Sequence, residues 1–443
     1  MTVDRSSQRS SGTSANPSGT VKGDRPVIAV LADQWEPKSE EGWATRQVAG
    51  ALACSADVHV ITPQGIVPSQ RVDSVFTLHE TATPSSPTAA VRRELLIEAI
   101  SDTGWSATGR LLPEYGRLLD RDLLDCWSAS SDILAGLRPD IVVIAGHQHL
   151  GALDAVDRVA PDVPIVLLAL GSDLNSLAFP HFDRIFDRSQ AVLAITETER
   201  LAIVEHHGGA DRVHRIGAPL AANPSALNEP NTWVGTTDYV FVISSTKTHA
   251  NEEAVALARL IRLRFPENPV GISATDAFSV WHQGRVGEGW PVERSSDLTR
   301  LMAWARVVVD LRPGPLFGRR CVDSLLYGTP IIVPGNSRAR EHAELGRGGL
   351  WFDTPGELAW CVEAMLDPEV RATFSAQGKA YAEDAFGSTD GYIERVLVAT
   401  GKACSDVGEI GMGGQIVIPS VGGIGAGVGG IGAGVETSLP ITA

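Results

Sequence analysis

The sequence has little of what marks a secreted, membrane-embedded or metal-binding protein. Its 443 residues include 5 cysteines, widely spaced and without a C-x-x-C pair. That pattern argues against a disulfide framework or a zinc site and favours a reducing compartment. No run approaches the ~20 apolar residues of a membrane span, and the amino-terminal segment lacks the apolar stretch of a signal peptide. We therefore expect a cytoplasmic protein without a metal site or a membrane span, and leave peripheral contact with a membrane open.

Basic residues are also in deficit. Lys and Arg number 37 against 53 Asp and Glu, which gives a formal net charge of -16 at pH 7. This charge argues against nucleic acid, or an anionic membrane surface, as the main partner. In so acidic a chain, cations that gather at one place indicate a bound anion such as phosphate.

Both ends of the chain have an unusual composition. Residues 1–25 are rich in Ser, Gly and Thr, and we expect them to be disordered. Residues 405–443 contain GGIGAGV twice in tandem, at 422–428 and 429–435. Gly425, Gly427 and Gly430 satisfy G-x-G-x-x-G, but no strand precedes them and no acidic residue follows about 20 positions later. This segment is therefore predicted to be a flexible tail and not a dinucleotide site.

The remaining chain is long enough for two domains of about 150 to 200 residues, and its 43% apolar share is enough for their cores. Short apolar runs bounded by Gly and Pro alternate with helical segments, which is typical of parallel sheets buried on both faces. Strands are expected at Val27–Leu31, Val58–Thr62, Ile141–Ala145, Ile165–Leu170, Val192–Ile195, Tyr239–Ser244, Val270–Ser273, Val307–Leu311, Pro330–Val333 and Gly349–Phe352.

The stretch Val307–Pro334 carries the clearest sign of a ligand. It predicts a strand, a Gly/Pro loop, a helix from Arg319 and a second strand, and ligands bind such units where the first strand ends and the helix begins. Arg319 and Arg320 stand in the first helical turn, where the dipole opposes cations unless an anion lies beside them. A bound phosphate and a solvated basic turn are both consistent with this pattern.

The same stretch resembles the donor-binding segment of GT-B glycosyltransferases of the family-4-like group (glycosyl transferases group 1). The pattern there is E-G-F-G-L-P, then a helix with a second Glu, then G-T-P. The matching residues are Phe317, Gly318, Asp323 and Gly328-Thr329-Pro330. The second acid binds the nucleotide ribose in the family, which implies that role for Asp323. Pro315 stands where the family has its first Glu, which touches the donor sugar.

Further motifs extend the resemblance from Val27 to Ala403. Residues 191–219 resemble the A-V-I-A-V-S-E motif and the strand after it, with Ala218-Pro219 in place of Asn-Gly. Ser296–Ala305 matches the helix L-x-x-h-h-A-x-A that precedes the donor segment. The resemblance implies two Rossmann-like domains that face each other across a cleft, the second binding the nucleotide and the first the acceptor.

The resemblance also implies the organisation of the chain. The expected parts are a disordered segment at 1–25, an amino-terminal acceptor domain at 26–220, a linker at 221–237, a carboxy-terminal nucleotide-sugar domain at 238–386, a helix crossing back to the first domain at 387–404, and a glycine-rich tail at 405–443.

Lys247 is the donor-site candidate outside the segment. Family members carry cations near this loop that neutralise the donor diphosphate, which implies that role for Lys247 together with Arg319 and Arg320. A solvated loop lysine is the alternative. Gly42 lies in the loop 33–42, where the family usually has Gly-Gly near the cleft, and an acidic surface loop is the alternative.

Two further candidates follow strands of the first half. His147 and His149 form an H-x-H pair, but with no third ligand nearby we expect them to line the cleft and not to bind metal. Asp173, in a G-S-D sequence, is the candidate catalytic residue at the acceptor, with a helix N-cap as the alternative. The family often has a His just before G-S-D, and Leu170 stands at that position.

The implied activity is transfer of a sugar from a nucleotide-diphosphate sugar to an acceptor hydroxyl, in the synthesis of a cell-surface glycan or glycoconjugate. The implied partners are the nucleotide sugar and a glycan or other hydroxyl acceptor, with no cofactor and no metal. Pro315 and Leu170 favour a second hypothesis, a catalytically inactive binding or regulatory protein. A third is a nucleotide-sugar 2-epimerase of the same fold.

Overall fold

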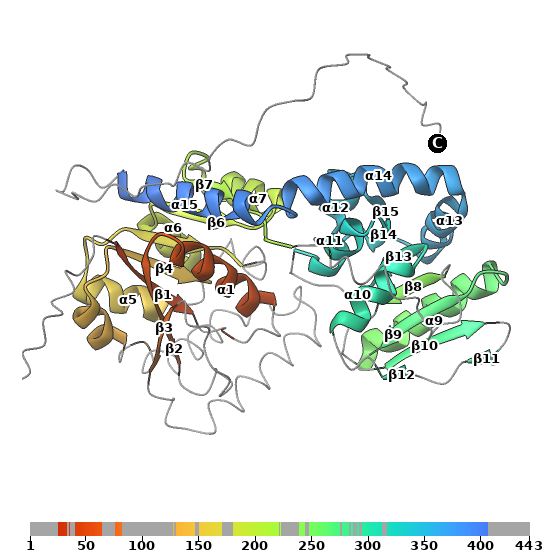
Figure 1. Ribbon diagram of the computed structural model, residues 1–443, viewed down its shortest axis with the longest axis horizontal. Coiled ribbons are helices and arrows are strands. Elements are labelled where there is room, and N and C mark those ends of the chain that lie inside the picture. The colour runs from red at the N-terminus through yellow and green to blue at the C-terminus, as the bar shows by residue number, and fades with distance from the viewer. Residues whose placement is uncertain are drawn as a thin grey trace, which may run out of the picture.

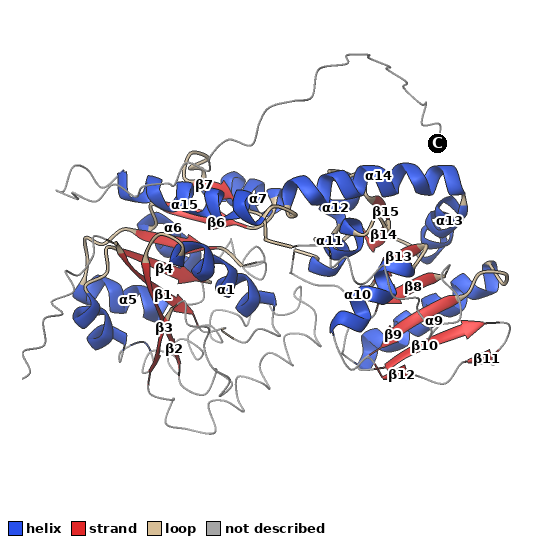
Figure 2. Ribbon diagram, viewed as in Figure 1, coloured by secondary structure: helices blue, strands red, loops and turns tan. Residues whose placement is uncertain are grey.

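The chain folds as two α/β domains, each built on its own sheet (Figures 1 and 2). The structure is a computed structural model, and it describes residues 25–32, 35, 40–63, 76–81, 127, 130–146, 150–170, 180–220, 222, 239–243, 248–274, 277–282, 285–286, 290–291, 295–311 and 317–405. The predicted fold class, α/β with two Rossmann-like domains, is confirmed. The expected disordered segment except Arg25, almost all of the linker, and the glycine-rich tail after Ser405 lie outside these residues.

The first sheet is parallel throughout, in the order β3-β2-β1-β4-β5-β6-β7. Its strands are β1 (Val27–Ala32), β2 (Asp57–Pro63), β3 (Thr77–Thr81), β4 (Ile141–Ala145), β5 (Ile165–Leu168), β6 (Ala191–Ala194) and β7 (Val213–Arg215). Its helices are α1 (Glu40–Ala53), α5 (Leu150–Val159), α6 (Pro180–Arg188) and α7 (Glu197–His207). Val30 and Leu31 are fully buried in different core clusters, because successive side chains of a strand point to opposite faces.

The second sheet has a parallel part, β9-β8-β13-β14-β15, extended by antiparallel pairs of β10 with β9, β11 and β12. The strands are β8 (Val240–Ile243), β9 (Val270–Ala274), β10 (Ala277–His282), β11 (Arg285–Val286), β12 (Trp290–Pro291), β13 (Val307–Asp310), β14 (Ile331–Pro334) and β15 (Gly349–Phe352). The helices are α9 (Thr248–Arg264), α10 (Ser295–Trp304), α11 (Arg319–Leu326), α12 (Arg340–Glu344), α13 (Pro355–Leu366) and α14 (Pro368–Ala385).

The last described helix, α15 (Thr389–Ser405), lies on the first domain although the helix before it belongs to the second (Figure 1). α14 packs on α11, whereas α15 packs on α1 and β6. Arg395 in α15 donates to the carbonyl of Ile216 at 2.8 Å, just after β7. The domain boundaries predicted from the sequence stay predictions, because residues 223–238 lie outside the described ones.

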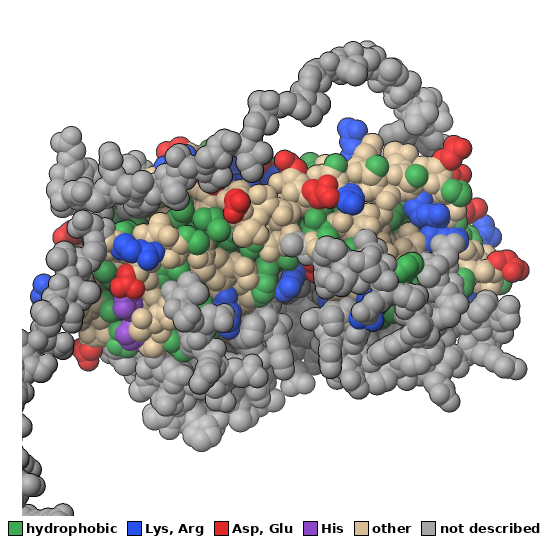
Figure 3. Space-filling model, viewed as in Figure 1, with side chains coloured by type: hydrophobic (Ala, Val, Ile, Leu, Met, Phe, Trp, Pro, Cys, Tyr) green, Lys and Arg blue, Asp and Glu red, His purple; other side chains and the backbone are tan. Residues whose placement is uncertain are grey.

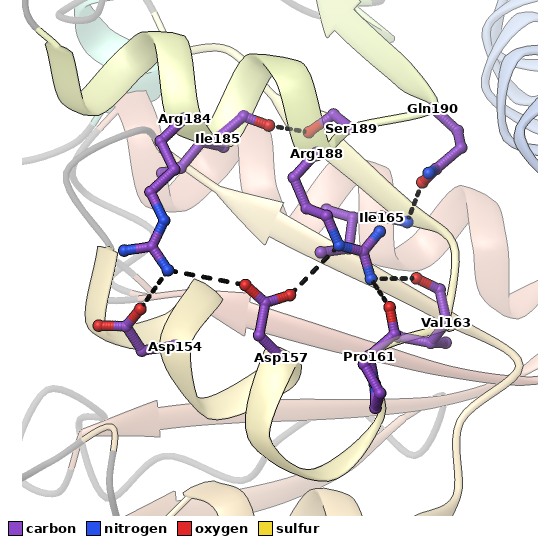
Figure 4. Close-up of polar contacts among 10 residues, drawn as sticks. All are labelled: Asp154, Asp157, Pro161, Val163, Ile165, Arg184, Ile185, Arg188, Ser189 and Gln190. Carbon is purple, nitrogen blue, oxygen red and sulfur yellow. Dashed lines mark hydrogen bonds and ion pairs between the residues drawn. The ribbon is translucent and has the colours of Figure 1, made fainter.

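Ion pairs hold α6 against α5 at the amino end of β5 (Figure 4). Arg184 lies 2.6 Å from Asp154, and Arg188 Nε lies 3.2 Å from Asp157. Arg188 also donates to the carbonyl of Val163 at 3.1 Å, two residues before the strand. These side chains are partly exposed, so each pair stabilises the fold by at most about 1 kcal/mol. The network is structural, because it lies at the sheet edge opposite the carboxyl ends of the strands.

A carboxylate from the second domain accepts hydrogen bonds from the amino end of α7 in the first. Thr196 caps the helix, and its hydroxyl accepts from the backbone N–H of Glu199. The N–H groups of Glu197 and Thr198 donate instead to Glu341 of α12, at 3.0 and 2.7 Å. Helix amino ends favour anions through their free N–H groups and dipole. Glu341 therefore joins the domains by the same physics that would otherwise bind a free anion there.

Glu199 completes the capping box beneath this contact. Its side chain is 2% exposed and accepts from the backbone N–H of Ile195 and Thr196, at 2.9 and 3.1 Å. Arg338 of the second domain lies 3.6 Å away. Burial nevertheless raises the pKa of Glu199 to about 7, against the opposing effects of Arg338 and the two amides.

The raised pKa of Glu199 predicts that stability falls as the pH rises. The folded protein binds more protons than the unfolded chain between the pKa values of about 4.5 and about 7, so stability is greatest below 4.5 and is lost as the pH passes 7. Glu199→Gln keeps a capping-box side chain but does not titrate. We expect chemical denaturation to show that the free energy of unfolding of the variant, relative to that of the wild type, is about 1–3 kcal/mol higher at pH 8 than at pH 4.5.

Glu357→Gln is the matched control, because Glu357 has the same place in the exposed capping box of α13. Comparison of the two variants separates the change in pH-dependent stability that comes from burial of the carboxyl group from the change that comes from removing its charge. An equal pH effect in both variants, or none in either, would contradict the role assigned to burial.

Close packing of α14 on α11 predicts opposite effects for two Gly→Ala substitutions. A Cβ on Gly378 in α14 would lie 2.6 Å from the Cα of Gly348 and 2.7 Å from Leu325, whereas one on Gly50 in α1 would meet no atom within 4 Å. We expect Gly378→Ala to destabilise by about 1–3 kcal/mol and Gly50→Ala to stabilise by about 0.5–1 kcal/mol, as measured by denaturant unfolding. A stabilising Gly378→Ala would show that the two helices separate at low cost.

Candidate functional site

The strand order places a ligand site at one position in each domain. The order reverses between β1 and β4 in the first sheet and between β8 and β13 in the second. Ligands of open α/β sheets bind outside the carboxyl ends of the strands at such a switch point. In the second domain those ends are Ile243 and Asp310, and the chain after Asp310 leads to Phe317, Gly318 and the amino end of α11. The candidate site is this helix end.

Gly318 forms the turn into α11. Its φ of 72° and ψ of 43° are left-handed, and a Cβ there would lie 2.7 Å from the Cβ of Ala339. Both facts require glycine. Its carbonyl accepts from the N–H groups of Cys321 and Val322, at 2.8 and 3.2 Å. Gly318 has no side chain, and α11 has no side-chain hydrogen bond at its cap, so this helix end is a candidate position for an anion.

Arg319 extends from this helix end to the first domain. Its guanidinium carbon lies 4.4 Å from the ring centroid of Trp43 in α1, within cation–π range. Its Nε lies 3.8 Å from the carboxylate of Asp323, one turn further along α11. The Arg319 side chain is 35% exposed and that of Asp323 20%, so both still reach solvent. Arg320 follows in the same turn and is half-buried.

Phe317 is placed differently from a ligand-binding side chain. Its ring is 2% exposed and stacks on Trp43, with centroids 5.9 Å apart, and on Phe386, with centroids 6.4 Å apart. The three rings form a column that joins α1 of the first domain to the end of α14. The ring of Phe317 is thus taken up by the domain contact, and only its backbone lies at the amino end of α11.

His342 and Tyr381 hold that backbone in place. The Nε2 of His342 bonds to the carbonyl oxygen of Phe317, and its Nδ1 lies 3.1 Å from the hydroxyl of Tyr381. Burial lowers the pKa of His342, so the ring is neutral. Because the carbonyl oxygen of Phe317 can only accept, a neutral ring donates from Nε2–H and leaves Nδ1 as an acceptor, while the Tyr381 hydroxyl beside it also forms a hydrogen bond with Glu341.

A buried acid lies behind the site. Asp310, at the carboxyl end of β13, is 3% exposed, and the thiol of Cys321 in α11 donates to it at 3.5 Å. Sequence reasoning missed Asp310, Trp43 and His342 as site residues. An acid ending a buried strand was a signal for Asp310, and the position next to Gly42 was one for Trp43, whereas His342 offered none.

The other predicted residues divide into two groups. Gly42 is buried in the first turn of α1, which begins at Glu40, so it lies in a helix and not in the expected loop 33–42, because acidic residues suit a helix amino end. Trp43 beside it contacts Arg319, so α1 and α11 do meet. The remaining candidates lie outside the described residues: Lys247, His147, His149, Asp173 and the loop position Pro315.

Searches for other kinds of site gave negative results within the described part of the chain. It holds no group of three or more His, Cys, Asp or Glu placed to bind a metal ion. Its helices include none that combines the length and the apolar character needed to cross a membrane. On the face seen in Figure 3, the described Lys and Arg side chains form separate patches with acidic ones between them.

Comparison with known proteins gives a likeness in structure alone. No protein-family model matches the chain, and no curated protein matches its sequence. The solved structures that match include HepE of Anabaena in complex with UDP and glucose, with 14% identity, a TM-score of 0.52, and coverage of 86% of this chain and 99% of that one. Another is the lipopolysaccharide outer core galactosyltransferase WaaB, with 10% identity, a TM-score of 0.55, and coverage of 84% and 98%.

A third is the α,α-trehalose 6-phosphate synthase of Burkholderia multivorans, with 13% identity, a TM-score of 0.58, and coverage of 87% of this chain and 100% of the other. These neighbours are GT-B glycosyltransferases, and the alignments take in both domains of each. At such low identity the likeness shows the fold. The chain therefore has the GT-B fold, as the resemblance of its motifs implied.

Proposed function

We propose that the protein is a glycosyltransferase that moves a sugar from a nucleotide-diphosphate sugar to an acceptor hydroxyl. The observation that carries the proposal is the amino end of α11, which has no capping side chain from Gly318, has Arg319 in its first turn and faces α1 of the other domain. A diphosphate suits such a site, because backbone N–H groups, the helix dipole and a guanidinium all favour it. The HepE structure with UDP and glucose supports a nucleotide sugar as the ligand.

The proposed roles follow from charge. In the reaction the bond between the anomeric carbon and the phosphate oxygen breaks, and the acceptor oxygen bonds to that carbon while losing its proton. Negative charge develops on the departing diphosphate. The α11 N–H groups, with Arg319, Arg320 and Lys247, would offset that charge. Asp323 would accept hydrogen bonds from the ribose hydroxyls, and Asp173 stays the proposed catalytic residue at the acceptor.

The finer assignments concern the product, the location and the acceptor side. The match to a lipopolysaccharide galactosyltransferase supports a cell-surface glycan or glycoconjugate as the product. The cysteine pattern supports a cytoplasmic location. His147, His149 and Gly42 are proposed to line the acceptor side of the cleft, and the proposed reaction uses neither a metal nor a cofactor.

One observation favours the second candidate, a catalytically inactive binding protein. Leu170 follows β5 at the place where the family often has a His, and it is 4% exposed within the first-domain core. An apolar side chain there supplies no group to the reaction. Pro315, in the donor loop, likewise lacks the carboxylate that touches the donor sugar in the family. A 2-epimerase, which acts on the nucleotide sugar itself, is the third candidate.

Nucleotide binding is the first prediction for this site. We expect a saturating concentration of UDP, GDP or ADP to raise the Tm of the protein by a few degrees, because a ligand that binds only the folded state stabilises it. Arg319→Ala should weaken binding of that nucleotide roughly tenfold to a hundredfold, the effect of one lost charge-assisted hydrogen bond. Isothermal titration calorimetry gives the affinities.

Arg184→Ala is the control for that substitution. It also removes an exposed helical arginine that pairs with carboxylates, but at the opposite edge of the first sheet (Figure 4). Its affinity should equal that of the wild type. The assignment of the site fails if none of the three nucleotides stabilises the protein, or if the two arginine variants bind alike.

Turnover separates the three candidate functions. The wild type, incubated with labelled UDP and GDP sugars, should release the nucleoside diphosphate slowly by transfer to water and faster with a suitable hydroxyl acceptor. Asp323→Asn should raise KM for the donor about tenfold, because a ribose contact is made in both the ground state and the transition state. Release is followed by chromatography of the nucleotide.

The alternatives give different products. Tight nucleotide binding without release, across the panel, would support the binding protein and contradict the transferase. An isomerised sugar still attached to its nucleotide would identify the epimerase.

A further inference from the structure

Two adjacent side chains of α12 contact two different parts of the molecule. Glu341 accepts hydrogen bonds from the N–H groups of Glu197 and Thr198, which are 144 and 143 residues away in the first domain. His342 bonds to the carbonyl of Phe317, at the turn into α11. Both side chains are buried, at 5% and 0% exposure. A single short helix thus contacts the partner domain and the candidate ligand site at once.

We propose that α12 couples the contact between the domains to the shape of the donor site, with Glu341 and His342 as its positioning residues. The inference rests on the proposed function, since it assigns a control of that same site. Glu341 holds α12 to the first domain. His342 transmits the position of α12 to the backbone that precedes the α11 amino end.

The contact between the domains provides acceptors for two backbone N–H groups at the amino end of α7. Glu199 donates to the hydroxyl of the capping residue Thr196, and Arg200 donates to its carbonyl at 3.2 Å. For Glu197 and Thr198 the acceptors are the oxygens of Glu341. Moving the domains apart would therefore remove the hydrogen-bond partners of two N–H groups and of a buried carboxylate at the same time. We therefore expect this contact to be either made or broken, and not to loosen gradually.

The link from α12 to α11 is equally close. His342 bonds to Phe317, and Ala339, just before α12, lies close to Gly318. A Cβ added at Gly318 would be only 2.7 Å from the Cβ of Ala339. A shift of α12 by a fraction of an ångström would thus press on Gly318 or break the bond to Phe317. Either change alters the carbonyl of Gly318 that starts the α11 hydrogen bonds.

Reciprocity follows from these contacts. If the closed domain contact holds the α11 amino end in its binding geometry, a diphosphate bound there must favour the closed contact by the same free energy.

The test is hydrogen–deuterium exchange without ligand, on the wild type, Glu341→Gln and Glu341→Asp. Cys321 and Val322 report on the α11 turn, because their N–H groups donate to Gly318. We expect Glu341→Gln to speed exchange at these two amides about tenfold, together with the first turn of α7. Glu341→Asp, which keeps the charge on a shorter side chain, should do so to a smaller extent and covers the case in which the amide variant fails to fold.

Glu357→Gln is the matched control. Glu357 also accepts two backbone N–H groups, those of Asp353 and Thr354, at 2.7 and 3.1 Å, but within its own domain. It should leave exchange at Cys321 and Val322 unchanged. Faster exchange at α7 alone in the Glu341 variants, or the same rise at α11 in Glu357→Gln, would overturn the coupling.

Two substitutions of His342 test the second half of the link. His342→Gln keeps a donor near the Nε2 position and should retain wild-type exchange at Cys321 and Val322 to within about threefold, whereas His342→Leu should speed it about tenfold. Equal exchange in both variants would show that His342 only fills space.

UDP affinity then connects the coupling to function. In a wild type that binds UDP, Glu341→Gln should weaken binding about tenfold, and Glu357→Gln should not. A wild type that binds no nucleotide would end the proposed function, while the exchange data would still decide the coupling.

Discussion

The backbone N–H groups at a helix amino end need acceptors, and the way each helix meets this need organises the molecule. α13 and α14 meet it within their own chain segment, through Thr354 and Asp367. α7 meets it partly through Thr196 and partly through Glu341 of the other domain. α11 begins at Gly318, which has no side chain for the purpose. The same requirement thus gives a cap in two places, a domain contact in a third and a candidate ligand site in a fourth.

Glycine at position 318 serves packing as well as conformation. Its left-handed φ could be met at some cost by Asn, but the approach of Ala339 leaves no room for any Cβ. The lack of a capping side chain on α11 is therefore a consequence of bringing α12 close. Because α12 lies so close to the turn at Gly318, His342 can contact Phe317. The uncapped start of α11 and the contact of His342 behind it therefore arise from one steric constraint.

Much of the fold could be predicted, because its signals are local. The expected strands at Ile141–Ala145 and Gly349–Phe352 match the structure to the residue, since short apolar runs that end at Gly, Pro or polar residues are typical of strands in a parallel sheet. The capping box of Thr196 and Glu199 is likewise a local signal, because T-x-x-E in the sequence is typical of a helix start. β10 to β12 were missed, because short antiparallel edge strands carry no continuous apolar run.

The candidate site was less predictable, for a physical reason. Arg319 and Gly318 stand in a recognisable local pattern, but the partners that fix them are distant in sequence. Trp43 reaches Arg319 from the other domain, and Glu341 meets α7 across 143 residues. Such contacts depend on how two domains meet, which no periodicity in one segment encodes. The family resemblance predicted roughly where the site lies. The contacts between the domains, which the structure shows, hold the residues of the site in place.

The contacts of Arg319 bear on how a ligand would enter. Its guanidinium already lies over Trp43 and near Asp323, at 4.4 and 3.8 Å. Both interactions are weak, because the side chain is one-third exposed and a single carboxylate at that distance is screened by solvent. A diphosphate offers two charges and several acceptors at short range, so it can outcompete them. Before the ligand binds, Trp43 and Asp323 would keep the guanidinium near its binding position. Less side-chain entropy would therefore be lost when the ligand binds.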